Sequence, residues 1–156
     1  MKKVIFISST GGHLSELLQL QPLFEEFDSI LITEKTKSNR SLSEKYPGRF
    51  YTLVYGTKKN LFFYVFKFGW NCIKSLYYFL KLKPDVIVTT GTHTAVPLCM
   101  IAHWMKKKVV YIETFANAKT ATQAGKMIYP IADLFLVQWE SMLEVYPNAI
   151  YKGGLF

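Results

Sequence analysis

Hydrophobic positions along this chain form short continuous runs that alternate with longer amphipathic stretches. The apolar runs predict strands at 3–9, 29–33, 50–55, 85–89, 108–112 and 134–138, with 149–152 as a candidate last strand. Apolar residues recur at helical spacing over 13–27, 60–82, 94–105, 120–129 and 140–146. Because most of the strands are apolar throughout, they indicate a parallel sheet covered on both faces. We expect one doubly wound, Rossmann-like α/β domain of six or seven strands over residues 1–156.

The polar segment 35–49 departs from this alternation. Its fifteen residues show no clear apolar period. Loops of this length are uncommon in compact domains unless they are functional or mobile. We therefore expect a functional or partly mobile loop here, with room for a short helical turn.

Composition narrows the class of protein. Half of the 156 residues are hydrophobic, which excludes a disordered chain. The two cysteines, Cys72 and Cys99, lie in apolar stretches without a CxxC spacing. We therefore expect neither a disulfide framework nor a metal site, and a reducing cytoplasm fits this cysteine usage.

The positive charge is concentrated in one part of the chain. The net charge is +8, and residues 58–83 carry six lysines and no acidic residue. A general nucleic-acid-binding protein would spread its cationic groups over a wider surface, so nucleic acid is not an expected partner. The basic stretch therefore needs a local explanation.

The predicted helix over 60–82 combines these lysines with many aromatic residues. Its polar residues fall within about a third of the helical circumference, and the remaining arc is apolar. One interpretation is a core helix with a solvated lysine stripe, and a true membrane span is disfavoured because Lys67 and Lys74 would lie well inside the hydrocarbon. The other is a helix in the membrane interface, with aromatic groups in the acyl boundary and lysines toward anionic headgroups. We favour the second, and the membrane-binding residues it predicts are Lys58, Lys59, Phe62, Phe66, Lys67, Trp70, Lys74 and Lys81.

Two glycine turns mark the candidate ligand site. With a sheet order of 3-2-1-4-5-6, the first and fourth strands are neighbours where the order reverses, and ligands bind at that point. Each of these strands ends in a glycine turn that leads into a helix N-terminus, a favourable place for an anion. Glycine also serves tight turns for backbone reasons alone. The candidate diphosphate-binding residues are Thr10, Gly11, Gly12, Gly91, Thr92, His93 and Thr94.

His13 and Glu113 are the candidate catalytic bases. His13 follows the first glycine turn, and Glu113 ends the fifth strand at the same edge of the sheet. The open alternatives are a histidine that only bonds its turn and a glutamate that only bonds a loop amide, that of Phe115 or Asn117. The GxGxxG dinucleotide pattern is absent, and Glu34 is the only candidate for an acidic ribose ligand.

Several motifs together resemble the asparagine-linked-glycosylation-fourteen-like family. They are SSTGGHLSEL at 8–17, TTGTHTAVP at 89–97, YIETFA at 111–116, QWE at 138–140 and the GGLF end. The bacterial members of this family serve capsular and exopolysaccharide synthesis. The family is similar to the N-terminal, acceptor-binding half of GT-B glycosyltransferases such as the peptidoglycan N-acetylglucosaminyltransferase, with Gly11, Gly12, His13, the 91–97 turn and Glu113 at matching places.

The resemblance implies one subunit of a two-chain glycosyltransferase, inactive or weakly active alone. It implies a peripheral protein at the cytoplasmic face of the membrane that presents a polyprenyl-diphosphate-linked saccharide to a UDP-sugar held by a catalytic partner. The chain itself then needs no cofactor or metal. Eukaryotic relatives carry an N-terminal membrane anchor. In this chain residues 58–83 are expected to attach the protein to the membrane instead. The tail Gly153, Gly154, Leu155 and Phe156 is expected to contact the partner, unless it is a frayed end.

Two other functions remain open. One is that of a membrane adaptor without a chemical role, and the other is that of a self-sufficient nucleotide-dependent enzyme. The first predicts that sugar transfer survives the loss of His13 and Glu113. The second predicts tight binding of UDP or NAD by the isolated chain.

Overall fold

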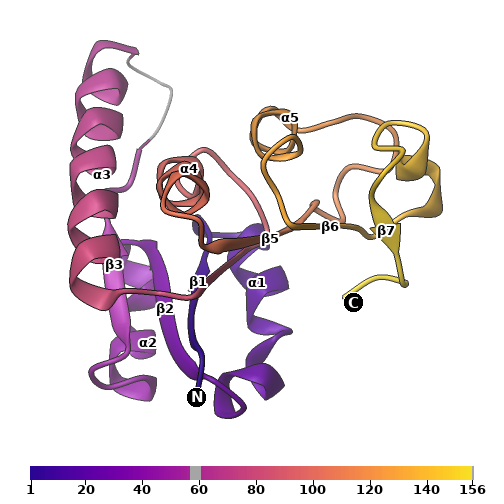
Figure 1. Cartoon of the computed structure of the whole chain (residues 1–156). Coiled ribbons are helices and arrows are strands. Elements are labelled where there is room, and N and C mark those ends of the chain that lie inside the picture. Colours follow the sequence, from indigo (N-terminus) through magenta and orange to yellow (C-terminus); the bar gives the residue numbers. More distant parts are fainter. Residues whose placement is uncertain (57–60, 156) are drawn as a thin grey trace.

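Seven parallel strands form a single twisted sheet in the part of the chain that the computed structural model describes, residues 1–56 and 61–155 (Figure 1). Its order, β3-β2-β1-β4-β5-β6-β7, reverses beside β1 as predicted. The strands are β1 Lys3–Ile7, β2 Asp28–Glu34, β3 Phe50–Leu53, β4 Val86–Thr89, β5 Lys108–Ile112, β6 Leu134–Val137 and β7 Ile150–Tyr151. The prediction of a doubly wound sheet of six or seven strands is therefore confirmed.

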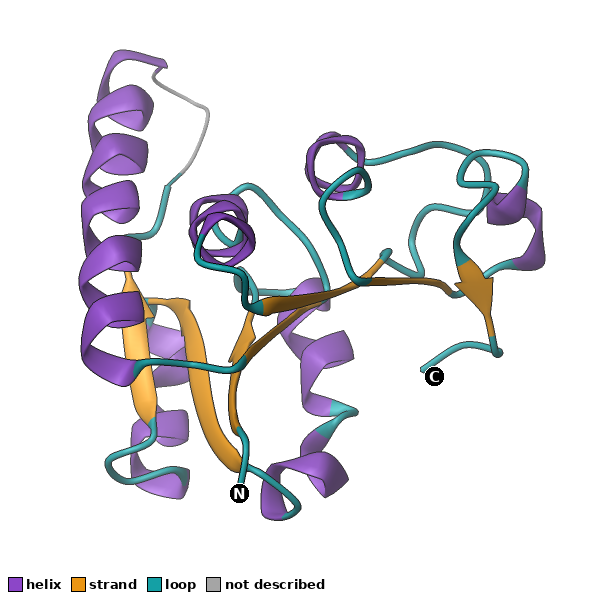
Figure 2. Cartoon of the chain, in the orientation of Figure 1, coloured by secondary structure: helices purple, strands orange, loops and turns teal. Residues whose placement is uncertain are grey.

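Helices cover both faces of this sheet (Figure 2). They are α1 Gly12–Leu18, α2 Arg40–Lys45, α3 Leu61–Leu82, α4 Val96–Trp104 and α5 Gln123–Ile128, with 3-10 turns η1 Gln21–Glu25, η2 Lys37–Asn39 and η3 Glu140–Leu143. Alternate residues of β1 separate two cores. Ile5 and Ile7 face a core shared with α3, α4 and α5. Val4 and Phe6 face a smaller core shared with α1, η1 and α2.

Proline interrupts the first predicted helix. The expected helix over 13–27 is instead α1 followed by η1, with Pro22 in the first turn of η1. Proline has no amide hydrogen to donate, and its ring clashes with the carbonyl four residues earlier in an α-helix. The expected helix over 140–146 is likewise only the 3-10 turn η3. The polar segment 35–49 contains η2 and α2, so it is more regular than the sequence indicated.

Helix α3 lies against the open edge of the sheet and satisfies the backbone of β3. The Asn71 side chain accepts from the Val54 amide at 2.8 Å and donates to the Val54 carbonyl at 2.9 Å, as a neighbouring strand would. The Thr52 carbonyl accepts from Lys74 Nζ at 2.6 Å and from the Tyr78 hydroxyl at 2.9 Å. Exposed strand edges invite pairing with other chains, and α3 removes that hazard on this side.

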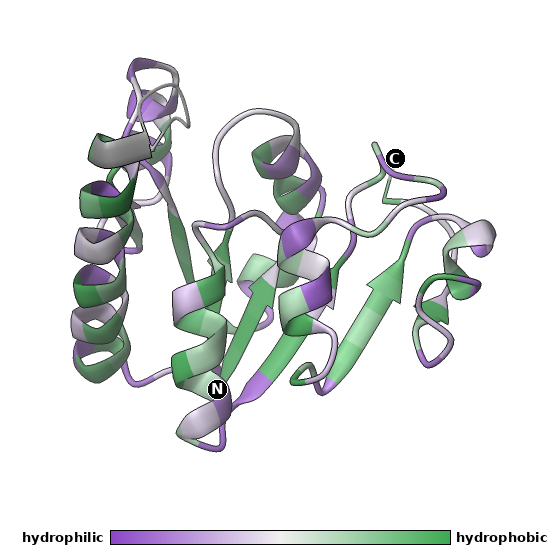
Figure 3. Ribbon diagram, turned by 90° about the horizontal axis from the view of Figure 1, so that it is seen from above, coloured by the Kyte–Doolittle hydropathy of each residue, from purple (hydrophilic) through white to green (hydrophobic). Residues whose placement is uncertain are grey.

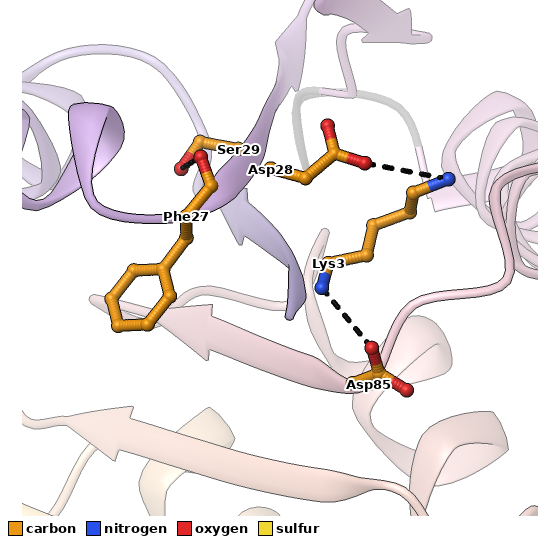
Figure 4. A network of polar contacts seen from close by, with 5 residues as sticks. All are labelled: Lys3, Phe27, Asp28, Ser29 and Asp85. Carbon is orange, nitrogen blue, oxygen red and sulfur yellow. Dashed lines mark hydrogen bonds and ion pairs between the residues drawn. The ribbon is translucent and has the colours of Figure 1, made fainter. Parts of the chain in front are cut away.

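Polar contacts also join the amino-terminal ends of β1, β2 and β4, at the edge of the sheet opposite the glycine turns (Figure 4). The backbone amide of Lys3 donates to Asp85 Oδ2 at 3.1 Å, and Lys3 Nζ lies 3.6 Å from Asp28 Oδ2. Lys107 Nζ lies 3.2 Å from the other oxygen of Asp85. The Lys3 amide and then the Lys107 ammonium hold the pKa of the Asp85 carboxyl below its usual range.

We expect Asp85→Asn to lower stability at neutral pH and to weaken the dependence of stability on acid. A carboxyl with a lowered pKa in the folded state stabilises the fold above its unfolded pKa of about 4, and this contribution is lost as the pH falls through the folded value. Urea unfolding at pH 7 and in steps toward pH 2 measures the effect. The exposed Glu144, as Glu144→Gln, is the control. If the free energy of unfolding falls equally with acid in wild type and in Asp85→Asn, Asp85 does not have a lowered pKa in the folded state.

Candidate functional site at the strand switch and on helix α3

The two predicted glycine turns lie side by side. Strand β1 pairs with β4, with Ile7 opposite Thr89, so the turns that follow both strands meet at the carboxyl edge of the sheet. The Thr90 hydroxyl donates to the His13 carbonyl at 2.6 Å, and His13 Nδ1 lies 2.9 Å from the Thr90 carbonyl. These two bonds join the turns into one unit, as the predicted strand order requires.

His13 is oriented for proton transfer. A carbonyl oxygen only accepts hydrogen bonds, so the bond to Thr90 places a proton on Nδ1 of the ring. In the neutral ring Nε2 then carries the lone pair. The side chain is half-buried at the crevice, so a group entering between the turns can reach it. This arrangement fits the predicted role of His13 as a general base.

The second turn is close-packed and strained. Gly91 has φ +104°, and a Cβ added there would lie 2.9 Å from the Tyr111 hydroxyl. The next residue, Thr92, has φ +79°, which is a true outlier for a β-branched side chain. Its buried hydroxyl has no hydrogen-bond partner within the described residues. Backbone strain of this kind clusters at ligand-binding turns, where the surrounding structure maintains it.

Two of the predicted diphosphate ligands bind a protein carboxylate instead. The Thr94 hydroxyl donates to Glu34 Oε1 at 2.6 Å, and the Thr10 hydroxyl lies 3.5 Å from Glu34 Oε2. Glu34 is only 2% exposed. Glu34 therefore holds both glycine turns in place by hydrogen bonds, and its carboxylate is not accessible to a ribose. His93, from the same predicted set, packs against the Tyr64 ring with centroids 5.4 Å apart.

Glu113 occupies a structural position rather than a catalytic one. Its carboxylate is 1% exposed and accepts from the Thr114 amide at 3.0 Å, the Thr122 hydroxyl at 2.9 Å and the Tyr146 hydroxyl at 2.7 Å. The prediction that it deprotonates a substrate is therefore wrong for this conformation, because every donor around it belongs to the chain. The loop-amide alternative is correct in kind, but the amides are those of Thr114 and Thr122, while the amides of Phe115 and Asn117 bind Glu16 and the Thr114 carbonyl.

A second buried carboxylate, Glu16, was not predicted. One oxygen accepts from the Thr114 hydroxyl at 2.8 Å, and the other accepts from Gln138 Nε2 at 3.0 Å. The sequence feature that could have revealed Glu16 is its position between Leu14 and Leu17, on the buried face of α1. Gln138 also accepts from the Leu155 amide at 2.8 Å. The tail predicted to contact a partner is thus bonded to its own chain at Leu155, while Phe156 lies outside the described residues.

The exposed surface of α3 is apolar, and its polar stripe is partly turned inward. Asn71 and Ser75 of that stripe are buried against the sheet, and Lys74 is half-buried on the Thr52 carbonyl. The side chains on the outer surface are large and apolar: Phe63, Val65, Phe66, Trp70, Ile73, Leu76, Tyr77 and Leu80, and Phe66 is 64% exposed. We call this set the α3 outer face. Figure 3 shows hydrophobic colour along α3 at the end of the sheet.

The predicted membrane lysines therefore differ in their surroundings. Lys67 is exposed, while the Lys81 ammonium lies 5.6 Å from the ring centroids of Tyr51 and Tyr77. Lys58, Lys59 and the side chain of Phe62 lie outside the described residues. Lys74 is neither solvated, as the core-helix alternative requires, nor directed toward headgroups, as we predicted, because α3 uses that side of the helix to close the edge of β3.

Comparison with known proteins identifies the family. The family model described as oligosaccharide biosynthesis protein Alg14 like matches residues 3–155. The chain belongs to the Alg14-like family. The human protein named UDP-N-acetylglucosamine transferase subunit ALG14 is 25% identical over 97% of this chain and 82% of its own length. The Schizosaccharomyces pombe protein of the same name is 39% identical over 45% of this chain and 36% of its own length.

Solved structures show the fold of this Alg14-like chain. Acinetobacter baumannii MurG superposes on 90% of it with a TM-score of 0.71 and 17% identity. Staphylococcus aureus MnaA, in a structure with UDP, superposes on 99% of it with a TM-score of 0.75 and 14% identity. The chain spans 43% and 44% of these two proteins. Its architecture is therefore that of one Rossmann-like domain of the GT-B type.

An apolar groove extends the α3 outer face toward α4. The groove has a volume of about 540 Å³ and is lined almost wholly by apolar side chains, among them Ile73, Leu76, Met100, Ile101 and Trp104. Across the described residues, no helix is both long enough and apolar enough to cross a membrane.

The cage around Glu113 gives a stability prediction for this Alg14-like chain. A Cβ added at Gly125 would collide with Glu113 Oε2 and the Tyr146 hydroxyl. We expect Gly125→Ala to lower the free energy of unfolding by about 2 kcal/mol or more, because overpacking a filled interior also displaces buried hydrogen bonds.

Gly69 is the matched control for this substitution. It lies on the exposed side of α3 with no atom near its added Cβ, so Gly69→Ala should stabilise the helix by about 0.5–1 kcal/mol. Urea unfolding of the two variants measures both changes. Equal stability of Gly125→Ala and wild type would show that the Glu113 cage is loose.

Proposed function

We propose that this chain is the membrane-associating, acceptor-binding subunit of a two-chain glycosyltransferase. Membership of the Alg14-like family and relatives named as UDP-N-acetylglucosamine transferase subunits support this function. The fold supports it as well, because the chain has the architecture of one GT-B-type domain and spans less than half of the solved proteins it resembles. By analogy with those names, the donor is UDP-N-acetylglucosamine, and it is bound by the other chain.

The observation that carries the proposal is the α3 outer face. Trp70, Ile73 and Phe66 are 56%, 60% and 64% exposed, beside an apolar groove. Contiguous apolar surface of this kind marks an interaction site. A membrane interface fits it best, since aromatic side chains enter the acyl boundary and the neighbouring Lys67 and Lys81 reach anionic headgroups. The protein is then peripheral, on the cytoplasmic face where the UDP-sugar is available.

The switch crevice supplies the acceptor chemistry in this proposal. A polyprenyl-diphosphate-linked saccharide extends from the membrane to the turns at Gly11, Gly12 and Gly91. His13 Nε2 takes the proton of the acceptor hydroxyl as that oxygen attacks the anomeric carbon of the UDP-sugar, and UDP leaves with the bonding electron pair. The chain contributes no metal or cofactor to this step. Capsular or exopolysaccharide synthesis is the pathway in which we propose that the reaction occurs.

Co-purification tests the two-chain arrangement. The tagged chain is co-expressed with the protein encoded beside it, and the recovered complex is screened with a panel of UDP-sugars. We expect a stable complex that binds UDP-N-acetylglucosamine, whereas the tagged chain alone binds no UDP. Tight UDP binding by the isolated chain would instead favour a self-sufficient nucleotide-dependent enzyme.

A non-catalytic adaptor is the second candidate function. The buried position of Glu113 favours it, because one of the two predicted bases has no access to a substrate. The two functions differ in what His13 does.

A further inference from the structure

A basic pocket lies beside the carboxyl end of β2 and over the face of β3, and none of its lining residues belongs to the glycine turns. It is a cavity of about 500 Å³ between the loop after β2 and the face of β3. Its lining residues are Lys35, Thr36, Lys37, Asn39, Arg40, Ser43, Phe50 and Thr52. Three of these eight residues are cationic and none is acidic. We call this cavity the basic pocket.

The cations of the basic pocket have no acidic partner. Within residues 1–56 and 61–155, the ion pairs involve Lys3, Lys107 and Lys108, and none involves a pocket residue. Lys35, Lys37 and Arg40 are all exposed. Like charges brought together without counterions destabilise the fold, and a bound anion relieves that repulsion.

A fourth cation, Lys74, lies beside the pocket without lining it. Lys74 of α3 donates to the carbonyl of Thr52, a lining residue. Desolvation, and secondly the charge of Lys35, lower the pKa of the Lys74 ammonium. The backbone amide of Lys35 donates to the Leu53 carbonyl at 2.8 Å, next along β3 from the Thr52 carbonyl that Lys74 binds. The pocket is thus coupled to the inner side of the helix whose outer face is apolar.

The loop that carries these cations is held in place. Asn39 is buried, and its Nδ2 donates to the Glu34 carbonyl at 3.0 Å, which ties η2 to the end of β2. The Thr36 and Ser38 hydroxyls bond at 2.9 Å. Lys37 begins η2 and Arg40 follows it as the first residue of α2, and helical side chains three residues apart lie on the same side. Their charges are therefore directed together before any ligand binds.

We propose that the basic pocket binds the phosphate of a membrane-embedded ligand, either an anionic phospholipid headgroup or the diphosphate of the lipid-linked acceptor, which in the second case lies in this pocket and not at the glycine turns. Phosphate oxygens accept several charge-assisted hydrogen bonds, and arginine with lysines supplies them. The location beside α3 places such a group at headgroup depth when the α3 outer face is in the acyl boundary. This inference deepens the proposed function and rests on it for the membrane.

Binding of sodium pyrophosphate to the full chain tests the pocket without a membrane. We expect calorimetry to show binding that weakens with added salt and becomes at least about tenfold weaker in Lys35→Ala/Lys37→Ala/Arg40→Ala. The control Lys119→Ala/Lys126→Ala/Lys152→Ala removes three exposed lysines elsewhere and should bind as wild type does. Charge reversal in Lys37→Glu, compared with Lys126→Glu, gives a second test if the triple variant folds poorly.

Vesicle co-sedimentation then distinguishes the two sources of phosphate. Phosphatidylcholine vesicles are compared with the same vesicles carrying undecaprenyl diphosphate or phosphatidylglycerol. Selective loss of the undecaprenyl-diphosphate enhancement in the pocket variant identifies a lipid-linked diphosphate, and equal loss of both enhancements identifies a general headgroup site.

The pocket and the proposed function fail separately. Equal pyrophosphate binding by the pocket and control variants, or no binding by wild type, would overturn the pocket. Either result leaves the membrane role of α3 to its own test, because pyrophosphate binding requires neither vesicles nor a partner chain.

Discussion

Phe66→Glu/Trp70→Glu is expected to abolish binding to phosphatidylcholine–phosphatidylglycerol vesicles while leaving the fold intact. Both side chains belong to the α3 outer face and are more than half exposed, so folding does not depend on their burial. Transfer of a large apolar side chain out of water contributes about 1.5–3 kcal/mol. Two lost contacts therefore weaken partitioning by at least about 100-fold, before any repulsion between the new carboxylates and the anionic headgroups.

Vesicle flotation with a matched double variant measures this effect. Ile150→Glu/Tyr151→Glu makes the same change of charge at exposed apolar positions on β7, at the other end of the sheet. The control should float with vesicles almost as wild type does. If both double variants float equally well, the membrane contact lies elsewhere and the role given to α3 is wrong.

His13→Ala is expected to lower the rate of sugar transfer by the assembled two-chain complex by about 10²- to 10⁴-fold, the usual contribution of a general base. The bond from Nδ1 to the Thr90 carbonyl leaves Nε2 as the acceptor, so the substitution removes the proton acceptor from the crevice. It leaves α3 unchanged, and vesicle binding should therefore persist. The measurement is the transfer rate at saturating donor and acceptor over a pH series.

Two comparisons separate chemistry from structure in this experiment. His103→Ala removes an exposed histidine of α4 and should keep the wild-type rate. Added imidazole should partly restore His13→Ala if a base is missing, but it would not repair a distorted turn. An unchanged rate in His13→Ala, with a stable complex, would favour the adaptor function.

The sheet was predictable from the sequence because its strands are buried on both faces. Continuous apolar runs then mark the strands almost without ambiguity, and the two glycine turns mark the point where the order reverses. Local breaks were harder to predict. The helical period across 13–27 outweighed Pro22, although proline cannot continue an α-helix at that place.

The orientation of α3 on the sheet could not be predicted from its helical period. A period shows that one side of a helix is polar, and it does not show what that side faces. Here the polar side bonds the backbone of an edge strand through Asn71 and Lys74, so the apolar side remains exposed. Of the residues in the predicted membrane contact, Phe66 and Trp70 are therefore exposed, whereas Lys74 is bonded to the sheet.

The remaining differences between the predicted and the observed site concern buried carboxylates. Glu34 and Glu113 both end strands at the predicted edge, as catalytic residues often do. Apart from the adjacent Thr114 amide, their hydroxyl and amide partners lie 9 to 60 positions away in the chain, and no local pattern reveals that pairing. His13 differs because its partner Thr90 lies on the neighbouring strand turn that the topology itself places beside it.

Reconstituted sugar transfer tests the central claim most directly. The rate of transfer from UDP-N-acetylglucosamine to a polyprenyl-diphosphate-linked acceptor in vesicles is measured with this chain alone, with the partner alone and with both. The two-chain account predicts transfer only when both chains are present. Full turnover by either chain alone would contradict it.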